Sequence, residues 1–216
     1  MLLNFYTMIR TVVFLFLVTV LASCNFSGDS DVITGPGETN SLSAKGEWGS
    51  YVVKYPVYGN SFADSLIREL TDSLVTGFKP MIKYALEDKM KYEMEVNYEE
   101  YFADGGIVSV VFNIYQFTGG AHGNTFIRSF VIDSKNKKML GLSDFFKGNG
   151  FKALQKTVRE KLKKKLDYDE SIDEGTAQPG DFSAFAVTND KFIFWFSPYQ
   201  VASYADGVQK VEIPRK

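Results

Sequence analysis

His122 is the single histidine of the chain, and it lies in the glycine-rich stretch at residues 119–123. An imidazole on an exposed loop can act as a general base or as a metal ligand. A zinc site usually needs three or four histidine or cysteine ligands, whereas this sequence has one of each. The G-x-S-x-G motif of a nucleophilic serine is also missing. We therefore predict that His122 shapes a turn or contacts a partner, with no catalytic residue, metal ion or cofactor.

Glu93, Glu95 and Glu99 are the next candidates for chemistry, because paired carboxylates can hydrolyse glycosidic bonds. Their spacing places all three on one face of a predicted strand, which Lys91 and Asn97 share with them. One acid of a hydrolytic pair needs a hydrophobic pocket that keeps it protonated, and these polar neighbours do not supply one. We interpret the glutamates as a solvated face. An envelope hydrolase acting on carbohydrate or peptidoglycan through these carboxylates is the alternative.

Two other charged segments suggest ligands. Carboxylates alternate over residues 167–173, but an EF-hand loop needs glycine at its sixth position and glutamate at its twelfth. Ile172 and Gln178 occupy those positions, so we predict a solvated loop and leave calcium in another geometry open. A basic stripe on the predicted helix at residues 151–166 could contact anionic lipid, although a solvated face is the simpler interpretation. The stripe consists of Lys152, Lys156, Arg159 and Lys163.

Cys24 is the only cysteine, and it follows the small residues of the motif Leu21-Ala22-Ser23. Arg10 is the only charged residue before it, and an apolar run lies between the two at residues 11–20. This order is typical of a secretory signal peptide, and the cysteine indicates a bacterial lipoprotein. We predict a signal peptide at residues 1–23 and lipidation of Cys24, for example with palmitate, which anchors the protein to a membrane. An uncleaved anchor is the alternative.

Asn25 favours the outer membrane, because it is not the aspartate associated with inner-membrane retention. The side of the membrane, periplasmic or surface, stays open. Residues 24–47 are rich in Ser, Gly, Asp, Thr and Asn, which predicts a flexible tether. The folded domain then covers residues 48–216, a length typical of one domain. The net charge of −2 gives no electrostatic basis for nucleic-acid binding.

The spacing of apolar residues predicts an α+β domain, in which one antiparallel β-sheet carries two amphipathic helices packed on one face. Pro56 cannot donate a backbone hydrogen bond, so the strand at residues 51–58 is predicted at a sheet edge. The strand at residues 191–196 includes the run 192–196, which is apolar on both faces and contains Trp195, so the strand should be central and covered by a helix. Other predicted strands lie at residues 91–102, 107–117, 125–133, 184–188 and 208–213, and the helices lie at 61–78 and 151–166.

Two segments between the predicted strands carry unusual glycine or tyrosine residues, at 118–124 and 197–207. Because no catalytic set accompanies them, we predict that they contact a partner. The candidate residues are Gly119, Gly120, His122, Tyr199, Tyr204 and Asp206.

Three segments resemble the RsiV/PdaC-like extracytoplasmic domains. These are residues 108–123, which end in Thr-Gly-Gly-Ala-His-Gly, residues 140–146, and residues 194–207, which read Phe-Trp-Phe-Ser-Pro-Tyr-Gln-Val-Ala-Ser-Tyr-Ala-Asp-Gly. Gln200 and Ser203 stand where the family has glutamate and proline. The family includes the outer part of a lysozyme-sensing anti-sigma factor and a domain that precedes a peptidoglycan deacetylase domain. The resemblance therefore implies a binding or sensing module of the cell envelope.

The leading hypothesis is a lipid-anchored envelope module that binds a muramidase-like protein or a cell-wall glycan and is not catalytic. We expect neither anti-sigma nor deacetylase activity, since the sigma-binding segment and the metal-binding histidines of those relatives are missing from the sequence. The alternatives are the carboxylate hydrolase described above and a scaffold lipoprotein.

Overall fold

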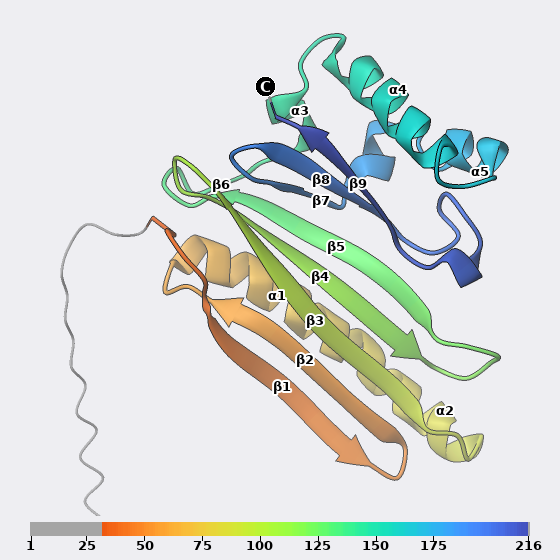
Figure 1. Cartoon of the computed structure of the whole chain (residues 1–216). Coiled ribbons are helices and arrows are strands. Elements are labelled where there is room, and N and C mark those ends of the chain that lie inside the picture. Colours follow the sequence, from red (N-terminus) through yellow and green to blue (C-terminus); the bar gives the residue numbers. More distant parts are fainter. Residues whose placement is uncertain (1–31, 216) are drawn as a thin grey trace, which may run out of the picture.

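The computed structural model describes residues 32–215, which form two β-sheets and the helices that cover them (Figure 1). The larger sheet contains, in spatial order, β1 (Glu38–Gly46), β2 (Gly49–Val57), β3 (Tyr92–Ala103), β4 (Ile107–Phe117), β5 (Asn124–Asp133) and β6 (Lys138–Met139). The smaller sheet contains β7 (Phe185–Val187), β8 (Lys191–Phe196) and β9 (Gln209–Pro214). The predicted α+β class is confirmed.

Neighbouring strands are antiparallel in both sheets, except for β2 and β3, which run parallel. A parallel pair needs a long crossover connection, and here the crossover consists of α1 (Ser61–Phe78), η1 (Lys79–Met81) and α2 (Ile82–Glu87). Strands β3, β4 and β5 follow one another through short connections and pair antiparallel. The predicted meander of three strands is thus confirmed.

Helix α1 covers one face of the larger sheet (Figure 1). Asn60 precedes the helix, and its side-chain oxygen accepts a hydrogen bond from the Ala63 N–H at 2.9 Å, which satisfies one of the free donors of the first turn. The buried positions of α1 recur every three or four residues, as expected for a helix with one face in the core. These positions are Ala63, Ile67, Thr71, Val75 and Phe78.

Helix α4 (Gly150–Lys163) covers the smaller sheet and buries Leu154, Val158 and Leu162. The rings of Phe194 and Phe196 belong to the same core cluster. Four short helical segments complete the connections around this sheet. They are α3 (Leu142–Phe145), α5 (Asp169–Glu174), η2 (Pro179–Phe182) and η3 (Tyr204–Asp206).

Strand β8 is buried on both faces because it lies between two layers. Phe194 faces the α4 side, whereas Ile193 and Trp195 contact a second cluster that includes Val111 of β4 and Ile127 of β5. The smaller sheet therefore packs on the face of the larger sheet that α1 leaves open. The prediction that residues 192–196 form a central, helix-covered strand is confirmed.

The prediction of one sheet with both helices on one face is wrong, because α1 covers the larger sheet and α4 covers the smaller one. Strand β5 pairs with β6 only at Ile132 and Asp133, so the larger sheet does not continue through β5. The later strands stack on its face instead. This layering follows from the sequence of β8, since a strand that is apolar on both faces needs an apolar layer on each side.

The prediction of a flexible tether is wrong for residues 38–46, which form β1 at the edge of the larger sheet. Strand β2 is consequently internal rather than at the edge. Pro56 is accommodated there because β2 pairs with β3 only as far as Val53. Ile33 is buried, and its N–H donates a hydrogen bond to Ser134 Oγ at 2.9 Å. The domain thus begins well before residue 48.

The predicted signal peptide at residues 1–23 and Cys24 lie outside the described residues. Within residues 32–215, no helix is both long enough and apolar enough to cross a membrane.

Candidate functional site

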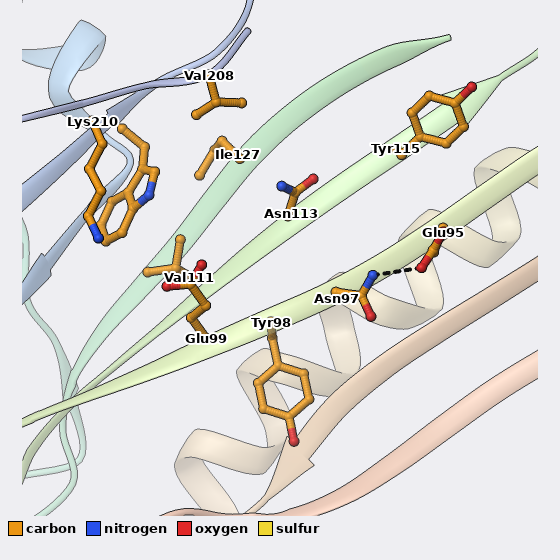
Figure 2. Close-up of a pocket in the computed structure, with 11 residues that line it drawn as sticks. Glu95, Asn97, Tyr98, Glu99, Val111, Asn113, Tyr115, Ile127, Val208 and Lys210 are labelled. Atoms are coloured by element: carbon orange, nitrogen blue, oxygen red, sulfur yellow. Dashed lines mark hydrogen bonds between the residues drawn. The ribbon is translucent and has the colours of Figure 1, made fainter.

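The larger sheet and the smaller sheet enclose a groove of about 490 Å³, within the range of small-ligand sites. Its floor is the face of β3 and β4 that points away from α1, and its wall comes from β5, β8, β9 and the segment that leads into β9 (Figure 2). The lining residues are Glu95, Asn97, Tyr98, Glu99, Val111, Asn113, Tyr115, Ile127, Trp195, Val208 and Lys210.

The register of β3 and β4 brings the polar floor residues together. Glu95 lies opposite Tyr115, and Asn97 lies opposite Asn113. Because side chains two residues apart share a face of a strand, Glu95, Asn97 and Glu99 follow one another along β3, as Figure 2 shows. The predicted polar face of this strand is confirmed: these three side chains are exposed, and Tyr92, Met94 and Val96 on the other face are buried.

Asn97 joins two charged side chains across the floor. Its Oδ1 accepts a hydrogen bond from Lys54 Nζ at 3.2 Å, and its Nδ2 donates one to Glu95 Oε1 at 2.8 Å. Within residues 32–215, Glu95 and Glu99 form no ion pair. The groove therefore carries negative charge that no neighbouring cation pairs with directly.

One end of the groove is closed by aromatic rings and a lysine. The Tyr101 hydroxyl donates a hydrogen bond to Glu99. Lys210 Nζ lies 5.3 Å from the ring centroid of Trp195 and 5.9 Å from that of Tyr101, close enough for a cation–π interaction. Partial burial and the adjacent Glu99 carboxylate raise the pKa of Tyr101 above its usual value, so its hydroxyl stays protonated and can donate.

The same lysine belongs to a charged group on β8 and β9. Lys210 lies 3.7 Å from Glu212, which also pairs with Lys191 at 2.8 Å. The hydrogen bond from Lys191 lowers the pKa of Glu212 and raises that of Lys191. Glu212 thus holds Lys210 at the rim, over the rings of the closed end.

The other end of the groove meets the loop that contains His122. Gly123 lies against the ring of Tyr115, and a Cβ at residue 123 would stand only 2.4 Å from that ring. The backbone oxygen of Gly123 accepts hydrogen bonds from the Tyr204 hydroxyl at 2.9 Å and from His122 Nδ1 at 2.9 Å. Gly123 therefore connects the groove to both of the loops predicted to contact a partner.

Three rings from these loops form a group that we call the aromatic cluster, consisting of His122, Tyr199 and Tyr204, of which the first two are exposed and Tyr204 is half-buried. His122 stacks on Tyr204 with ring centroids 3.8 Å apart and planes inclined by 21°. The centroids of Tyr199 and Tyr204 are 5.6 Å apart, and the Tyr199 hydroxyl lies 3.4 Å from His122 Nε2. The structure thus brings together three of the candidate residues that the sequence named.

Gln200 holds the loop that carries Tyr199. Its Nε2 donates to the backbone oxygens of Gly175 and Asp181 at 3.1 and 2.8 Å, and its Oε1 accepts from the Ser197 N–H at 3.1 Å. Tyr199 itself has a φ of +68° and is 63% exposed. A non-glycine residue in this left-handed region is uncommon and often marks a functional loop, so Tyr199 is held outward by the bonds of its neighbour.

The other predicted candidates are not part of the aromatic cluster. Gly119 and Gly120 form the turn between β4 and β5 with positive φ values of 92° and 97°. A Cβ at Gly119 would approach the Tyr92 ring rather than His122. Asp206 lies in η3, where the Ser203 hydroxyl donates to it at 2.6 Å and, together with Tyr168, lowers its pKa.

Carboxylates of the segment predicted as a solvated loop pair with lysine and arginine instead. Asp173 of α5 lies 2.9 Å from Lys163 and 3.4 Å from Arg159 of α4. No group of three or more possible metal ligands occurs within residues 32–215. Part of the basic stripe on α4 is thereby neutralised.

Asn113, Tyr115 and Lys210 are site residues that the sequence analysis missed. Asn113 carried a weak signal, since it is a polar residue within the mostly apolar run of β4. Lys210 carried none, because its role depends on how β9 packs against Tyr101 and Trp195.

Two family models match the chain in succession: "Deacetylase PdaC" over residues 42–125 and "Protein of unknown function (DUF3298)" over residues 143–216. The first spans β2, β3 and β4, and the second spans the smaller sheet. The groove lies where the two matched segments meet, since Glu95 and Tyr115 come from one and Trp195 and Lys210 from the other.

Two curated relatives are longer than the matched region. The chain is 31% identical over 189 residues to the peptidoglycan-N-acetylmuramic acid deacetylase PdaC of Bacillus subtilis, covering 84% of this chain and 40% of that protein. It is 28% identical over 130 residues to the immunogenic protein MPB64 of Mycobacterium bovis, covering 57% of each. The chain thus spans about half the length, or less, of the curated relatives it matches.

Crystal structures of two DUF3298 proteins have a similar fold. A Bacteroides fragilis member superposes with a TM-score of 0.54 at 19% identity, covering 85% of this chain and 92% of that one. A Pseudomonas aeruginosa member superposes with a TM-score of 0.59 at 20% identity, covering 83% and 91%. These structures show a shared fold, and the two family models together with the Bacillus relative support a PdaC-like family of extracytoplasmic domains for this chain.

Proposed function

We propose that the protein is a lipid-anchored, non-catalytic envelope domain that binds a glycan strand of the cell wall. The strand would lie along the groove and across the aromatic cluster. One observation carries this proposal: Gly123 joins the exposed ring of His122 and the half-buried ring of Tyr204 directly to Tyr115 at the open end of the groove. Sugar rings have apolar faces and polar edges, which suits a surface that combines aromatic rings with amide and carboxylate groups.

The name of the Bacillus relative points to the same class of ligand. That protein is a peptidoglycan-N-acetylmuramic acid deacetylase, so its substrate is the glycan of the cell wall. We therefore extend the ligand class, peptidoglycan, to this chain. We do not extend the deacetylase activity, because the chain covers only 40% of that protein.

Hydrolysis by the groove carboxylates is disfavoured by their surroundings. Glu95 and Glu99 both line the groove, four positions apart on β3. Both side chains are exposed, so neither has the apolar surroundings of a catalytic acid.

The position of the aromatic cluster suits a domain anchored through its N-terminus. Residue 32 enters at the end of the sheet where β4 begins, and His122 lies beyond the other end of β4 (Figure 1). A strand of 11 residues separates these ends by about 35 Å. With lipid on Cys24, the aromatic cluster would point away from the membrane, and Asn25 favours the outer membrane as its location.

A protein partner, such as a muramidase-like enzyme, is the second candidate. The observation that favours it is Tyr199, which is 63% exposed and projects from a held loop. Tyrosine is enriched among the residues that dominate protein–protein binding energy.

Co-sedimentation tests the two candidates. The full-length chain in mild detergent should sediment with purified peptidoglycan sacculi, and His122→Ala, Tyr199→Ala and Tyr204→Ala should each weaken this binding. Tyr84→Ala is the matched control, because Tyr84 is an exposed tyrosine on α2, outside the aromatic cluster. Sacculi that fail to retain the wild type, or that retain all four variants equally, would refute the glycan proposal. Binding of lysozyme alone, lost in the same three variants, would establish the second candidate.

A further inference from the structure

We propose that the groove prefers amino sugars whose nitrogen is a free ammonium over the same sugars with an acetylated nitrogen. This inference rests on the proposed function, because it names the chemical form of the glycan that the same groove would bind. Its basis is the distribution of charge, hydrogen-bonding groups and rings within the groove.

The charge on the groove floor is negative and unpaired. Glu95 and Glu99 both line the groove and form no ion pair within residues 32–215, and Glu93 continues the same exposed face of β3. Asp173, elsewhere in the domain, pairs with Lys163 at 2.9 Å. A cationic ligand could make the same kind of contact with a floor glutamate.

The two lysines that border the floor are already engaged. Lys54 donates to Asn97 Oδ1, and Lys210 lies over the Trp195 ring and 3.7 Å from Glu212. Neither pairs with Glu95, which is the glutamate next to the open end and to Tyr115. The position beside Glu95 is therefore the one best suited to an ammonium group.

The hydrogen bonds of Glu95 also leave room for a donor. Asn97 Nδ2 bonds to Oε1, and the structure gives Oε2 no partner within the described residues. An ionised carboxylate has about four acceptor positions, and a bond from an ammonium to such a group is shorter and stronger than a bond from a neutral amide. Acetylation removes the charge and adds a methyl group, so it takes away the stronger interaction.

The remaining lining fits the rest of a sugar ring. Asn113 is exposed opposite Asn97, where its amide can bond to hydroxyl groups. Tyr115 offers a ring face next to Gly123, at the junction with the aromatic cluster. An oligosaccharide can thus place one amine at Glu95 while its neighbouring units extend toward His122 or toward Glu99.

A matched pair of ligands tests the inference on the full-length chain in mild detergent. The ligands are a tetramer of glucosamine and a tetramer of N-acetylglucosamine, titrated by calorimetry at about pH 6, where glutamates are ionised. We expect the glucosamine tetramer to bind about tenfold more tightly, as one charge-assisted hydrogen bond allows. Raising the salt concentration should reduce this preference.

Variants locate the preference. Glu95→Gln should abolish most of it, and Glu99→Gln should reduce it, while both keep the size of the side chain. Glu69→Gln is the control, because Glu69 is an exposed glutamate of α1, on the opposite face of the sheet. Tetralysine is a further control for non-specific attraction of positive charge.

The outcomes separate the inference from the proposed function. Equal binding of the two tetramers, or tighter binding of the acetylated one, would overturn the inference and leave glycan binding intact. Tetralysine that binds as tightly as the glucosamine tetramer would also overturn it, since the groove would then attract charge alone. If neither tetramer binds and sacculi are not retained, the proposed function fails together with the inference.

Discussion

The rings of His122 and Tyr204 stack with their centroids 3.8 Å apart, and the hydroxyl of Tyr204 donates to the backbone oxygen of Gly123 beside that histidine. The contact ties the loop between β4 and β5 to the loop that precedes β9, so two segments 81 residues apart in the sequence form one surface. Changes to Tyr204 should separate the contribution of the ring from that of the hydroxyl.

Tyr204→Phe retains the stacked ring and removes one hydrogen bond, so it should lower the free energy of unfolding by about 1 kcal/mol and leave binding to sacculi nearly unchanged. Tyr204→Ala also removes the stacking, which adds roughly 0.5–1.5 kcal/mol, and should weaken binding at least about tenfold. Urea unfolding and co-sedimentation measure the two effects. Binding lost equally in both variants would mean that the hydroxyl, and not the ring, contacts the ligand.

Gly123→Ala should affect binding more than stability. A Cβ at residue 123 would stand 2.4 Å from the Tyr115 ring, and the ring can move aside at modest cost because it is the end of a side chain. Its movement would break the junction between the groove and the aromatic cluster. Calorimetry with the glucosamine tetramer checks binding, and thermal unfolding checks stability. Unchanged affinity would contradict the role assigned to this junction.

Removal of β1 should destabilise the domain. A chain that begins at Trp48 loses nine cross-strand pairs with β2, from Glu38–Val57 to Gly46–Gly49, and exposes β2 as a new edge. Cross-strand pairs contribute roughly 0.2–1 kcal/mol each, so we expect a loss of roughly 2–5 kcal/mol in the free energy of unfolding. A chain that begins at residue 32 is the control and should unfold like the full-length chain. Equal stability of the two fragments would mean that residues 32–47 do not stabilise the fold, as expected of a flexible tether.

Acid should weaken the connection between α4 and α5. The hydrogen bond from Lys163 and the charge of Arg159 hold the pKa of Asp173 below its usual value. A carboxyl group with a lower pKa in the folded state stabilises that state above the ordinary aspartate pKa of about 3.9, and this contribution is lost as the pH falls through the folded value. Asp173→Asn should therefore be less stable than the wild type near neutral pH and equal to it in strong acid.

Urea midpoints at about pH 7, 4 and 2.5 measure this difference. Asp167→Asn is the control, because Asp167 precedes α5 and forms no ion pair within residues 32–215. If the urea midpoint of Asp173→Asn stays below that of the wild type by the same amount in acid, the effect of the substitution comes from packing rather than from charge.

Lipidation of Cys24 is tested by growth with labelled palmitate. The wild type should incorporate label and fractionate with membranes, and Cys24→Ser should do neither. Label in Cys24→Ser, or membrane fractionation without label, would contradict a lipoprotein anchor.

Local patterns predicted the individual elements well. The alternation of Tyr92, Met94 and Val96 with glutamates identified β3 and the face that it buries, because a period of two residues reports burial directly. The two apolar faces of residues 192–196 likewise placed β8 in a central position covered by a helix. The polar composition of residues 38–46 led to the wrong prediction of a flexible tether. An edge strand can be built from Ser, Thr and Asn when the neighbouring strand, here β2 with Val52 and Val53, pairs with it.

The sequence by itself determined the strand and helix periodicities, the family resemblance, and the two loops worth attention, since all of these are properties of neighbouring residues. Tertiary structure decided the division into two sheets, the stacking of His122 on Tyr204, and the groove between Glu95 and Lys210. Each of these depends on segments that are distant in sequence, and the backbone pairing of β3 with β4 and the packing of β8 on β4 and β5 bring them together. No local pattern encodes which distant residues will share a face, because this depends on how both sheets and their helices bury their apolar side chains together.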